Sequence, residues 1–417
     1  MSQATTVGAP QQEDNRARHR WRVLSLVAAG FVALSAVRIV TGQHTITSPG
    51  TIQAMLAFAV PIGLAGLGGL WAERSGVINI GLEGMMVFGT WFGAFAAWTS
   101  GNPWVGLAAG ILGGMLGGLI HAVATVGFGV DHIVSGVAIN ILSVGAMRYL
   151  SVLYFVEAPG GGAGQSPQLP EFPTVGAPFV AGALGGLAER NWFLLSDAAG
   201  VVIGLTTGMS AITLVALLLL PVTYYLLWHS RFGLRLRSAG ENPDAAESLG
   251  VNVYAYKYVA LLTSGGLAGM GGVFLAMVAS SVYQEGQTGG RGYIGLAAMI
   301  FGNWRPGGLA MGAGLFGFTD ALQVRGQGGA VHALLLLLAV VLVAVAARQW
   351  SRGNRTAAVV SLAVAGALTV VYTVTDTVPE ELVIASPYIT TLLVLSLASQ
   401  RLRPPAAIGR AWRRRAS

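Results

Sequence analysis

Apolar runs of about the length of a membrane-spanning helix follow one another along most of the chain, separated by short polar or glycine-rich stretches. A helix needs roughly 20 apolar residues to cross the hydrocarbon core of a bilayer. The runs lie at about 23–40, 52–71, 84–99, 103–126, 133–156, 198–228, 256–283, 291–303, 306–323, 331–347, 357–375 and 387–400. This pattern predicts an all-α polytopic membrane protein with about 10–12 transmembrane helices.

The composition supports the same class of protein. Hydrophobic residues make up 54% of the 417 residues and charged residues 10%, whereas a soluble domain carries about 25% charged residues. The 60 glycines favour close packing, because small residues let helix backbones approach in lipid. The absence of cysteine excludes thiol chemistry and disulfides. His121 and His332 lack the spacing of metal ligands, so we expect no metal ion and no cofactor on this chain.

Arginines gather at both ends of the chain and in the loops that an even number of spans would place in the cytoplasm. An excess of arginine marks cytoplasmic loops, and this explains the net charge of +7 better than nucleic-acid binding does. We therefore expect both termini in the cytoplasm. The predicted parts are a disordered basic N-terminus at 1–20, a transmembrane domain at 21–401 with an external loop at 157–197 and a cytoplasmic loop at 229–255, and a basic cytoplasmic tail at 402–417.

Three short sequences recur in the same order in the two halves of the chain. The matches are GLAGLGGLW (63–71) with GLAGMGGVF (266–274), IGLEGM (80–85) with IGLAAM (294–299), and GLAAG (106–110) with GLAMG (308–312). The predicted topology places the first pair in opposite directions across the membrane. The pattern therefore predicts inverted repeats, an arrangement common in transporters. Chance matching between helices rich in glycine, alanine and leucine is the alternative.

The sequence WAERSGVINIGLEGMM at 71–86 interrupts an apolar region with polar residues and glycines. Glycine weakens a helix by about 1 kcal/mol relative to alanine, so Ser75-Gly76 indicates a break. We expect the helix to restart near Ile78 or Asn79, which would place Asn79 and Glu83 on one helical face.

A carboxylate at membrane depth is costly and marks function by default. We therefore predict that Asn79 and Glu83 line a substrate pathway. The alternative for Glu83 is a structural role, as partner of a buried arginine or of a helix N-terminus. Three further polar residues, Asn140, Asn303 and Trp304, are candidates for the same pathway, although a buried amide can also bridge helices and tryptophan also marks membrane interfaces.

The longest polar stretch on the predicted cytoplasmic side, residues 229–258, contains the signals of a short surface helix. Asn242 suits the N-cap, Pro243 the first helical position and Asp244 the first turn, while Gly250 suits the end. Such a helix, flanked by arginines, could dock into a partner's groove; an ordinary solvated loop is the alternative. The candidate docking residues are Glu241, Asn242, Pro243, Asp244, Ala245, Ala246, Leu249 and Gly250.

RSGVINIGLEGMM resembles the signature of permease subunits of bacterial nucleoside ABC importers, within the simple-sugar and branched-chain amino-acid permease superfamily. FGLRLRSAGENPDAAESLGVNV resembles the family's coupling segment, and AMIFGNWRPGG and FGFTDALQ resemble its later helices. The similarity covers about residues 50–325 and 386–401. Residues 328–378 depart from the family as a two-span insertion, and the N-terminal extension is long.

The resemblance implies a transport subunit of the bacterial cell membrane rather than an enzyme. It would form half of an alternating-access pathway for nucleosides beside a second homologous permease subunit in membrane lipid. A cytoplasmic ATP-binding subunit would dock on residues 241–250 and use the ATP, and an extracellular lipoprotein would deliver the cargo. The chain itself has no phosphate loop of the form GxxxxGK[ST]. The alternatives are a same-superfamily importer of simple sugars or branched-chain amino acids, and an ion-coupled secondary transporter that uses Glu83 and Asp320.

Overall fold

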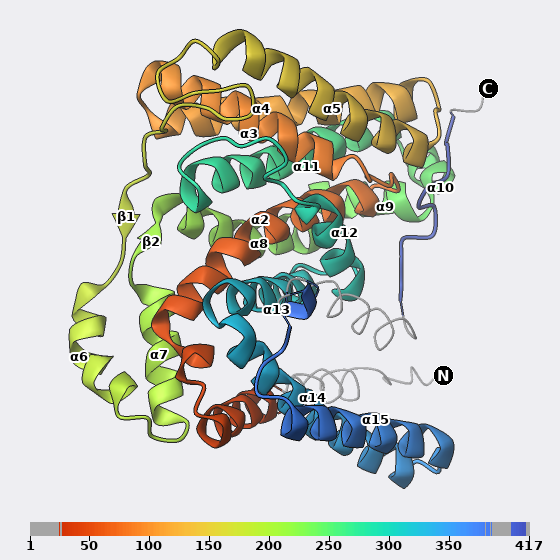
Figure 1. The fold of residues 1–417 in the computed structure, drawn as a ribbon. Helices are drawn as coiled ribbons and strands as arrows, with labels where there is room; N and C mark the ends of the chain where they lie inside the picture. The colour runs from red at the N-terminus through yellow and green to blue at the C-terminus, as the bar shows by residue number, and fades with distance from the viewer. Residues whose placement is uncertain (1–24, 26, 380, 384, 386–401, 414–417) are drawn as a thin grey trace, which may run out of the picture. The chain divides into compact units, whose positions relative to one another are not determined.

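The computed structural model describes residues 25, 27–379, 381–383, 385 and 402–413, and this part of the chain is mostly helical (Figure 1). The helices are α2 (Pro49–Arg74), α3 (Leu82–Ser100), α4 (Pro103–Ala122), α5 (His132–Tyr154), α6 (Pro178–Glu189), α7 (Leu195–Thr206), α8 (Ala211–His229), α9 (Arg231–Glu241), α10 (Pro243–Ser248), α11 (Val253–Phe274), α12 (Arg291–Phe301), α13 (Pro306–Arg325), α14 (Gln327–Ser351) and α15 (Arg355–Val374). The shorter elements are η1 (His44–Thr47), η2 (Val123–Gly127), η3 (Leu275–Ala279), β1 (Thr174–Val175) and β2 (Met209–Ser210).

Among the described residues, 7 helices are long and apolar enough to cross a membrane. Three shorter apolar helices lie at Val27–Thr41, Leu195–Thr206 and Arg291–Phe301. The prediction of an all-α polytopic membrane protein is confirmed. The predicted count of 10–12 spans stays a prediction, because the last apolar run, 387–400, lies outside the described residues, as does the predicted N-terminal part at 1–20.

One predicted span is wrong. The run at 198–228 is divided between α7, which ends at Thr206, and α8, which begins at Ala211. Between them Gly208 has a φ of +64°, a conformation that only glycine adopts easily. Met209 then pairs with Val175 in the antiparallel ladder of β2 and β1. A left-handed turn and an extended pair therefore break a run whose composition alone indicates a continuous helix.

The chain divides into two compact units. One comprises the described parts of Met1–Thr51, Phe179–Gly204 and Leu322–Ile384. Within it, α14 and α15 lie side by side as a hairpin (Figure 1). A buried ion pair joins Arg38 to Asp197 at 2.7 Å, and the hydroxyl of Thr47 donates to the same carboxylate at 2.5 Å. The carboxylate of Asp197 thus joins three segments of this unit.

The second unit comprises the described parts of Ile52–Pro178, Leu205–Ala321 and Ala385–Ser417, and it holds both predicted repeats. The first helices of the repeats, α2 and α11, lie antiparallel. Gly68 packs against the carbonyl of Ser264, and seven residues further along α11 Gly271 packs against the carbonyl of Pro61. Opposite directions for equivalent helices agree with the inverted-repeat prediction.

Each of these first helices packs against the second and third helices of the other repeat. Gly269 of α11 lies in close backbone contact with Gly89 of α3 and Gly114 of α4. Correspondingly, Gly66 of α2 packs against Gly295 of α12 and against Leu309 of α13. Glycine at these points permits the approach, because a Cβ would meet a neighbouring backbone or side-chain atom. The repeated glycines therefore fix the crossing points of the bundle.

Candidate functional site

The interrupted segment follows α2, which ends at Arg74, and the chain turns at Gly76 with a φ of +90°. The next helix, α3, begins at Leu82 rather than near Ile78 or Asn79. The predicted restart is therefore about three residues too early. Asn79 lies outside any helix, so the argument that Asn79 and Glu83 share a helical face is wrong.

Two histidines form hydrogen bonds with the backbone of Ile78 in the unwound stretch between α2 and α3. The backbone N–H of Ile78 donates to Nδ1 of His132 at 3.3 Å, and its carbonyl accepts from Nε2 of His121 at 2.9 Å. The other ring nitrogen of His121 lies 2.9 Å from the hydroxyl of Ser135. The backbone N–H and carbonyl of this partly buried residue are thus satisfied by side chains instead of helical bonds, which explains why the helix does not restart here.

Glu83, in the first turn of α3, contacts the start of α12. Its two carboxylate oxygens accept backbone hydrogen bonds from Gly290 at 2.8 Å and Gly292 at 2.7 Å. The first amides of a helix lack intrahelical acceptors and carry partial positive charge, so a carboxylate there is stabilised. The structure thus places Glu83 at a helix N-terminus, the structural role left open as an alternative, and also at a cavity.

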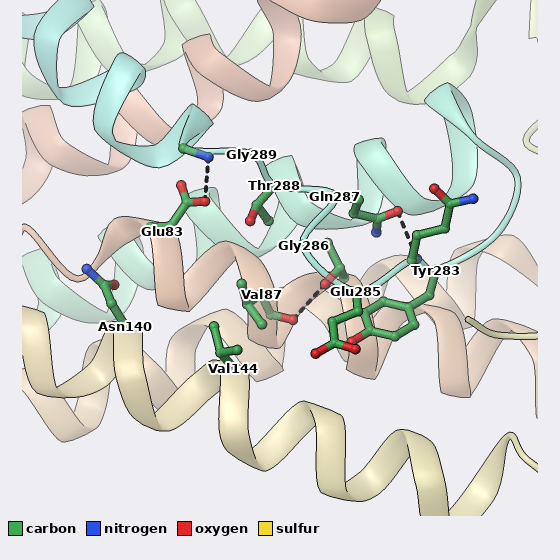
Figure 2. Close-up of a pocket in the computed structure, with 13 residues that line it drawn as sticks. Glu83, Val87, Asn140, Val144, Tyr283, Glu285, Gly286, Gln287, Thr288 and Gly289 are labelled. Carbon is green, nitrogen blue, oxygen red and sulfur yellow. Dashed lines mark hydrogen bonds between the residues drawn. The ribbon is translucent and has the colours of Figure 1, made fainter. Parts of the chain in front are cut away.

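Asn140 of α5 joins the same region. Its Oδ1 accepts from the N–H of Gly84 at 2.8 Å, and its Nδ2 donates to the carbonyl of Ile80 at 3.1 Å and to the hydroxyl of Tyr293 at 2.8 Å. One amide therefore connects α5, the end of the unwound stretch and α12. Figure 2 shows Asn140 and Glu83 below the loop that leads into α12.

A cavity of about 210 Å³ lies between these residues and the loop at 283–290 (Figure 2). Its lining offers neutral hydrogen-bonding groups from amides, hydroxyls and a phenol. The phenol of Tyr283 is uncharged at neutral pH, as an ordinary phenol is. The lining residues are Glu83, Val87, Thr90, Asn140, Val144, Tyr283, Gln284, Glu285, Gly286, Gln287, Thr288, Gly289 and Gly290.

The two carboxylates of the cavity already have partners. Glu83 accepts from the α12 backbone, and Glu285 pairs with Arg148 of α5. By contrast, Nε2 of Gln287 is buried and has no hydrogen-bond partner among the described residues. The arrangement can bind an uncharged polar molecule through neutral groups, with the amide of Gln287 as an available donor.

The other predicted pathway residues do not line this cavity. Asn79 is fully buried, with Nδ2 donating to the hydroxyl of Ser264 at 2.9 Å and Oδ1 without a partner among the described residues. Trp304 lies beyond the opposite end of α12 from Glu83, about 16 Å away along the helix axis. The amide oxygen of Asn303 accepts from the backbone of Arg403 at 2.8 Å.

Glu73 and Arg74 hold Trp304 in place. The indole Nε1 donates to Oε2 of Glu73 at 2.5 Å, and the guanidinium of Arg74 donates to the carbonyl of Trp304 at 2.7 Å and 3.2 Å. The interrupted segment therefore contacts both ends of α12, through Glu73 and Arg74 at one end and through Glu83 at the other.

The predicted docking helix is present as α10. Asn242 caps it by accepting from the N–H of Ala245 at 3.0 Å, Pro243 is its first residue, and Gly250 ends the turn with a φ of +80°. Ala246, however, is buried against Ala239 and Val253, so it belongs to the internal face of the helix.

The exposed apolar surface of α10 is small. Ala245 is exposed, and Leu249, just beyond the last helical residue, is 84% exposed. Residues 402–413, which we call the tail segment, reach this helix near their end, where the indole of Trp412 donates to Asp244 at 2.9 Å. An apolar side chain left in solvent beside a capped helix is a suitable point of contact for a partner.

Sequence reasoning missed several residues of the site. The histidines His121 and His132 are distant from Ile78 in sequence, and no local pattern indicates their contacts with it. The cavity loop at 283–290 has a usable signal, because the polar, glycine-rich sequence QEGQTGG occupies the place in the second repeat that the interrupted segment occupies in the first.

A model of the family described as branched-chain amino acid transport system / permease component matches residues 51–346. Guanosine ABC transporter permease protein NupQ of Bacillus subtilis is 36% identical over 286 residues, which cover 66% of this chain and 82% of NupQ. Nucleoside ABC transporter permease protein NupC of Lactococcus lactis is 35% identical over 288 residues, or 66% of this chain and 83% of NupC. Putative glucose ABC transporter permease protein TsgC13 of Haloferax volcanii is 34% identical over 278 residues, or 67% and 78% of the two chains. No solved structure matches the chain.

Proposed function

Since the chain belongs to the family of permease components of branched-chain amino acid transport systems, we propose that it is a permease subunit of an ATP-driven importer of nucleosides. It is a multi-pass membrane protein, and its proposed place is the bacterial cell membrane with both termini in the cytoplasm. A second homologous permease subunit supplies the other half of the pathway, and an external lipoprotein delivers the cargo.

The observation that carries the choice of cargo is the neutral lining of the cavity. Its two carboxylates are paired, and Nε2 of Gln287 has no hydrogen-bond partner among the described residues, so this neutral amide is available to bind a solute. A nucleoside is uncharged and rich in hydrogen-bonding groups, so it fits such a lining. A zwitterionic amino acid would need charged partners for its ammonium and carboxylate groups.

ATP is used by a separate cytoplasmic subunit that docks on residues 241–250, and this chain needs no cofactor of its own. The exposed side chain of Leu249 and the capped helix α10 support this docking site. ATP binding would close the ATPase, move α10 and switch the permease pair between its two orientations.

The test is reconstitution of the full complex in vesicles, with uptake of labelled guanosine measured with and without ATP. Leu249→Ala should remove the ATP-binding subunit from the purified complex, because it deletes the proposed apolar contact. The side chain is 84% exposed and has little internal packing to lose, so the fold of this chain should stay intact. Leu382→Ala, which also removes an exposed leucine but lies far from α10 in sequence, is the control. Retention of the ATP-binding subunit by the Leu249 variant would contradict the docking site.

Glucose is a second candidate cargo, because TsgC13 is described as a putative glucose permease and a sugar is also uncharged and polar. Competition separates the two: excess unlabelled nucleoside should abolish guanosine uptake, whereas excess glucose should leave it unchanged. The reverse result would assign the sugar.

A further inference from the structure

The tail segment is bonded to the end of α9 through two hydrogen bonds and to the docking helix α10 through a third. The N–H of Ala407 donates to the carbonyl of Gly240 at 3.0 Å, and the N–H of Ala406 donates to Oε2 of Glu241 at 3.0 Å. Six residues on, the indole of Trp412 donates to Asp244 at 2.9 Å. Glu241 and Asp244, both predicted to contact the ATP-binding subunit, thus already accept bonds from this chain's own tail.

The tail segment is also bonded to the interrupted segment at 71–86. The N–H of Gly409 donates to the carbonyl of Gly76 at 3.0 Å, at the turn where α2 ends. Near its beginning, the N–H of Arg403 donates to the amide of Asn303, beyond the end of α12. Pro405 and Ala407 are buried, so the tail segment packs into this unit instead of lying loosely on it.

Gly76, in the turn between α2 and the unwound stretch, is the point at which the backbone can bend. Its φ of +90° is strained for any other residue, and a Cβ there would lie 3.2 Å from the Cα of Gly240. Residues that absorb backbone changes at element ends serve as hinges. The tail segment therefore joins a docking helix to a candidate hinge.

We propose that the tail segment is the link that passes movement of α10 to the break at Gly76, with Trp412 as the positioning residue at the α10 end. This inference rests on the proposed function. When the ATP-binding subunit moves α10 and the adjoining end of α9, the bond at Asp244 and the bonds at Glu241 and Gly240 carry the tail with them. The bond from Gly409 then moves the Gly76 turn, and with it the unwound stretch that leads to Glu83.

The test uses Trp412→Phe and Trp412→Ala in the complete reconstituted complex. The phenylalanine variant removes the indole N–H but keeps a ring against Tyr254, whose centroid is 5.1 Å from that of Trp412. We measure guanosine transported per ATP hydrolysed. Trp412→Phe should lower this ratio about three- to tenfold, the range expected for losing one ordinary hydrogen bond, and Trp412→Ala, which loses the ring as well, should lower it further. Trp350→Phe, which changes an exposed tryptophan at the end of α14, is the control.

A second variant guards against a folding defect. Ala407→Pro removes the N–H bonded to Gly240 and should lower the same ratio in protein that still elutes as an intact complex. An unchanged ratio in both Trp412→Ala and Ala407→Pro would overturn the link. A rise in transport after deletion of residues 402–417 would also overturn it, because the tail would then be an obstacle.

Failure of the proposed function gives a different result. If no ATP-binding subunit associates with the unmodified chain, the importer assignment fails. If the subunit associates and hydrolyses ATP at the normal rate in every tail variant, and only the transport ratio falls, both the importer assignment and the link hold.

Discussion

The indole nitrogen of Trp304 donates a hydrogen bond to the carboxylate of Glu73 at 2.5 Å, and both side chains are buried. Trp304 itself has a φ of +53°, which is uncommon for a residue with a side chain. The buried hydrogen bond to Glu73 and the contacts from Arg74 hold it there. The end of α12 is thus fixed to the end of α2, next to the turn at Gly76.

Removing the indole donor should destabilise the protein. Trp304→Phe keeps an aromatic ring but leaves the buried Glu73 carboxylate without this partner, at a cost of about 1–3 kcal/mol. Thermal unfolding in detergent measures the loss. The double variant Trp304→Phe with Glu73→Gln should lose less than the sum of the two single variants, because they share one interaction. Additive losses would contradict the pairing.

Glu83 is expected to act through α12. Glu83→Ala removes both acceptors from the N–H groups of Gly290 and Gly292 and should loosen the helix start, at a cost of about 1.5–3 kcal/mol for bonds to a charged group. Guanosine uptake should fall while the complex still assembles. Glu189→Gln, which changes an exposed carboxylate at the end of α6 outside the cavity lining, is the control and should retain the uptake. Normal uptake in Glu83→Ala would show that the cavity does not need this helix start.

Features of the structure that depend on neighbouring residues in the chain could be predicted from the sequence. The break at Gly76 depends on glycine and on the residues beside it, and the N-cap at Asn242 depends on a bond to a residue three positions away. Both were predicted correctly from the sequence. The division of the 198–228 run was missed, because the strand pair that breaks it involves residues 174 and 175, distant in the chain.

The restart of the helix at Leu82 was missed for the same reason. Ile78 stays unwound because side chains from α4 and α5 bind its peptide group, and their approach depends on the packing of the whole bundle. Burial of Ala246 likewise depends on Ala239 and Val253, which the spacing within α10 does not reveal. The residue types in the sequence indicated which positions carry functional polar groups. The packing and hydrogen-bond partners of these positions are set by the tertiary structure and could not be predicted.

The two histidines should be energetically coupled through Ile78. His121→Ala leaves the Ile78 carbonyl without its partner, and His132→Ala leaves the N–H without its partner, each at a cost of about 0.5–1.5 kcal/mol for one hydrogen bond at a partly buried residue. Once either bond is lost, the unwound stretch can shift and the second bond contributes less. A double-mutant cycle by thermal unfolding should therefore show a coupling of about 0.5–3 kcal/mol. Independent effects would mean that the two rings do not hold one conformation.

The N-cap of α10 should matter for docking more than for folding. Asn242→Ala removes the acceptor of the Ala245 N–H and costs about 1 kcal/mol of helix stability. Because α10 has 6 residues, that loss is enough to fray it and to displace Leu249. Association with the ATP-binding subunit, measured by co-purification, should weaken, whereas Asn242→Asp, which keeps a capping oxygen, should retain it.

Asn252→Ala provides the matched control for this cap. Asn252 caps α11 in the same way, accepting from the N–H of Ala255 at 3.1 Å, but α11 has 22 residues and is buried along most of its length. The same cap energy is lost there without unwinding the helix, since tertiary packing holds it. ATPase association should therefore stay normal in Asn252→Ala. Equal weakening in both variants would mean that general instability, and not the conformation of α10, governs docking.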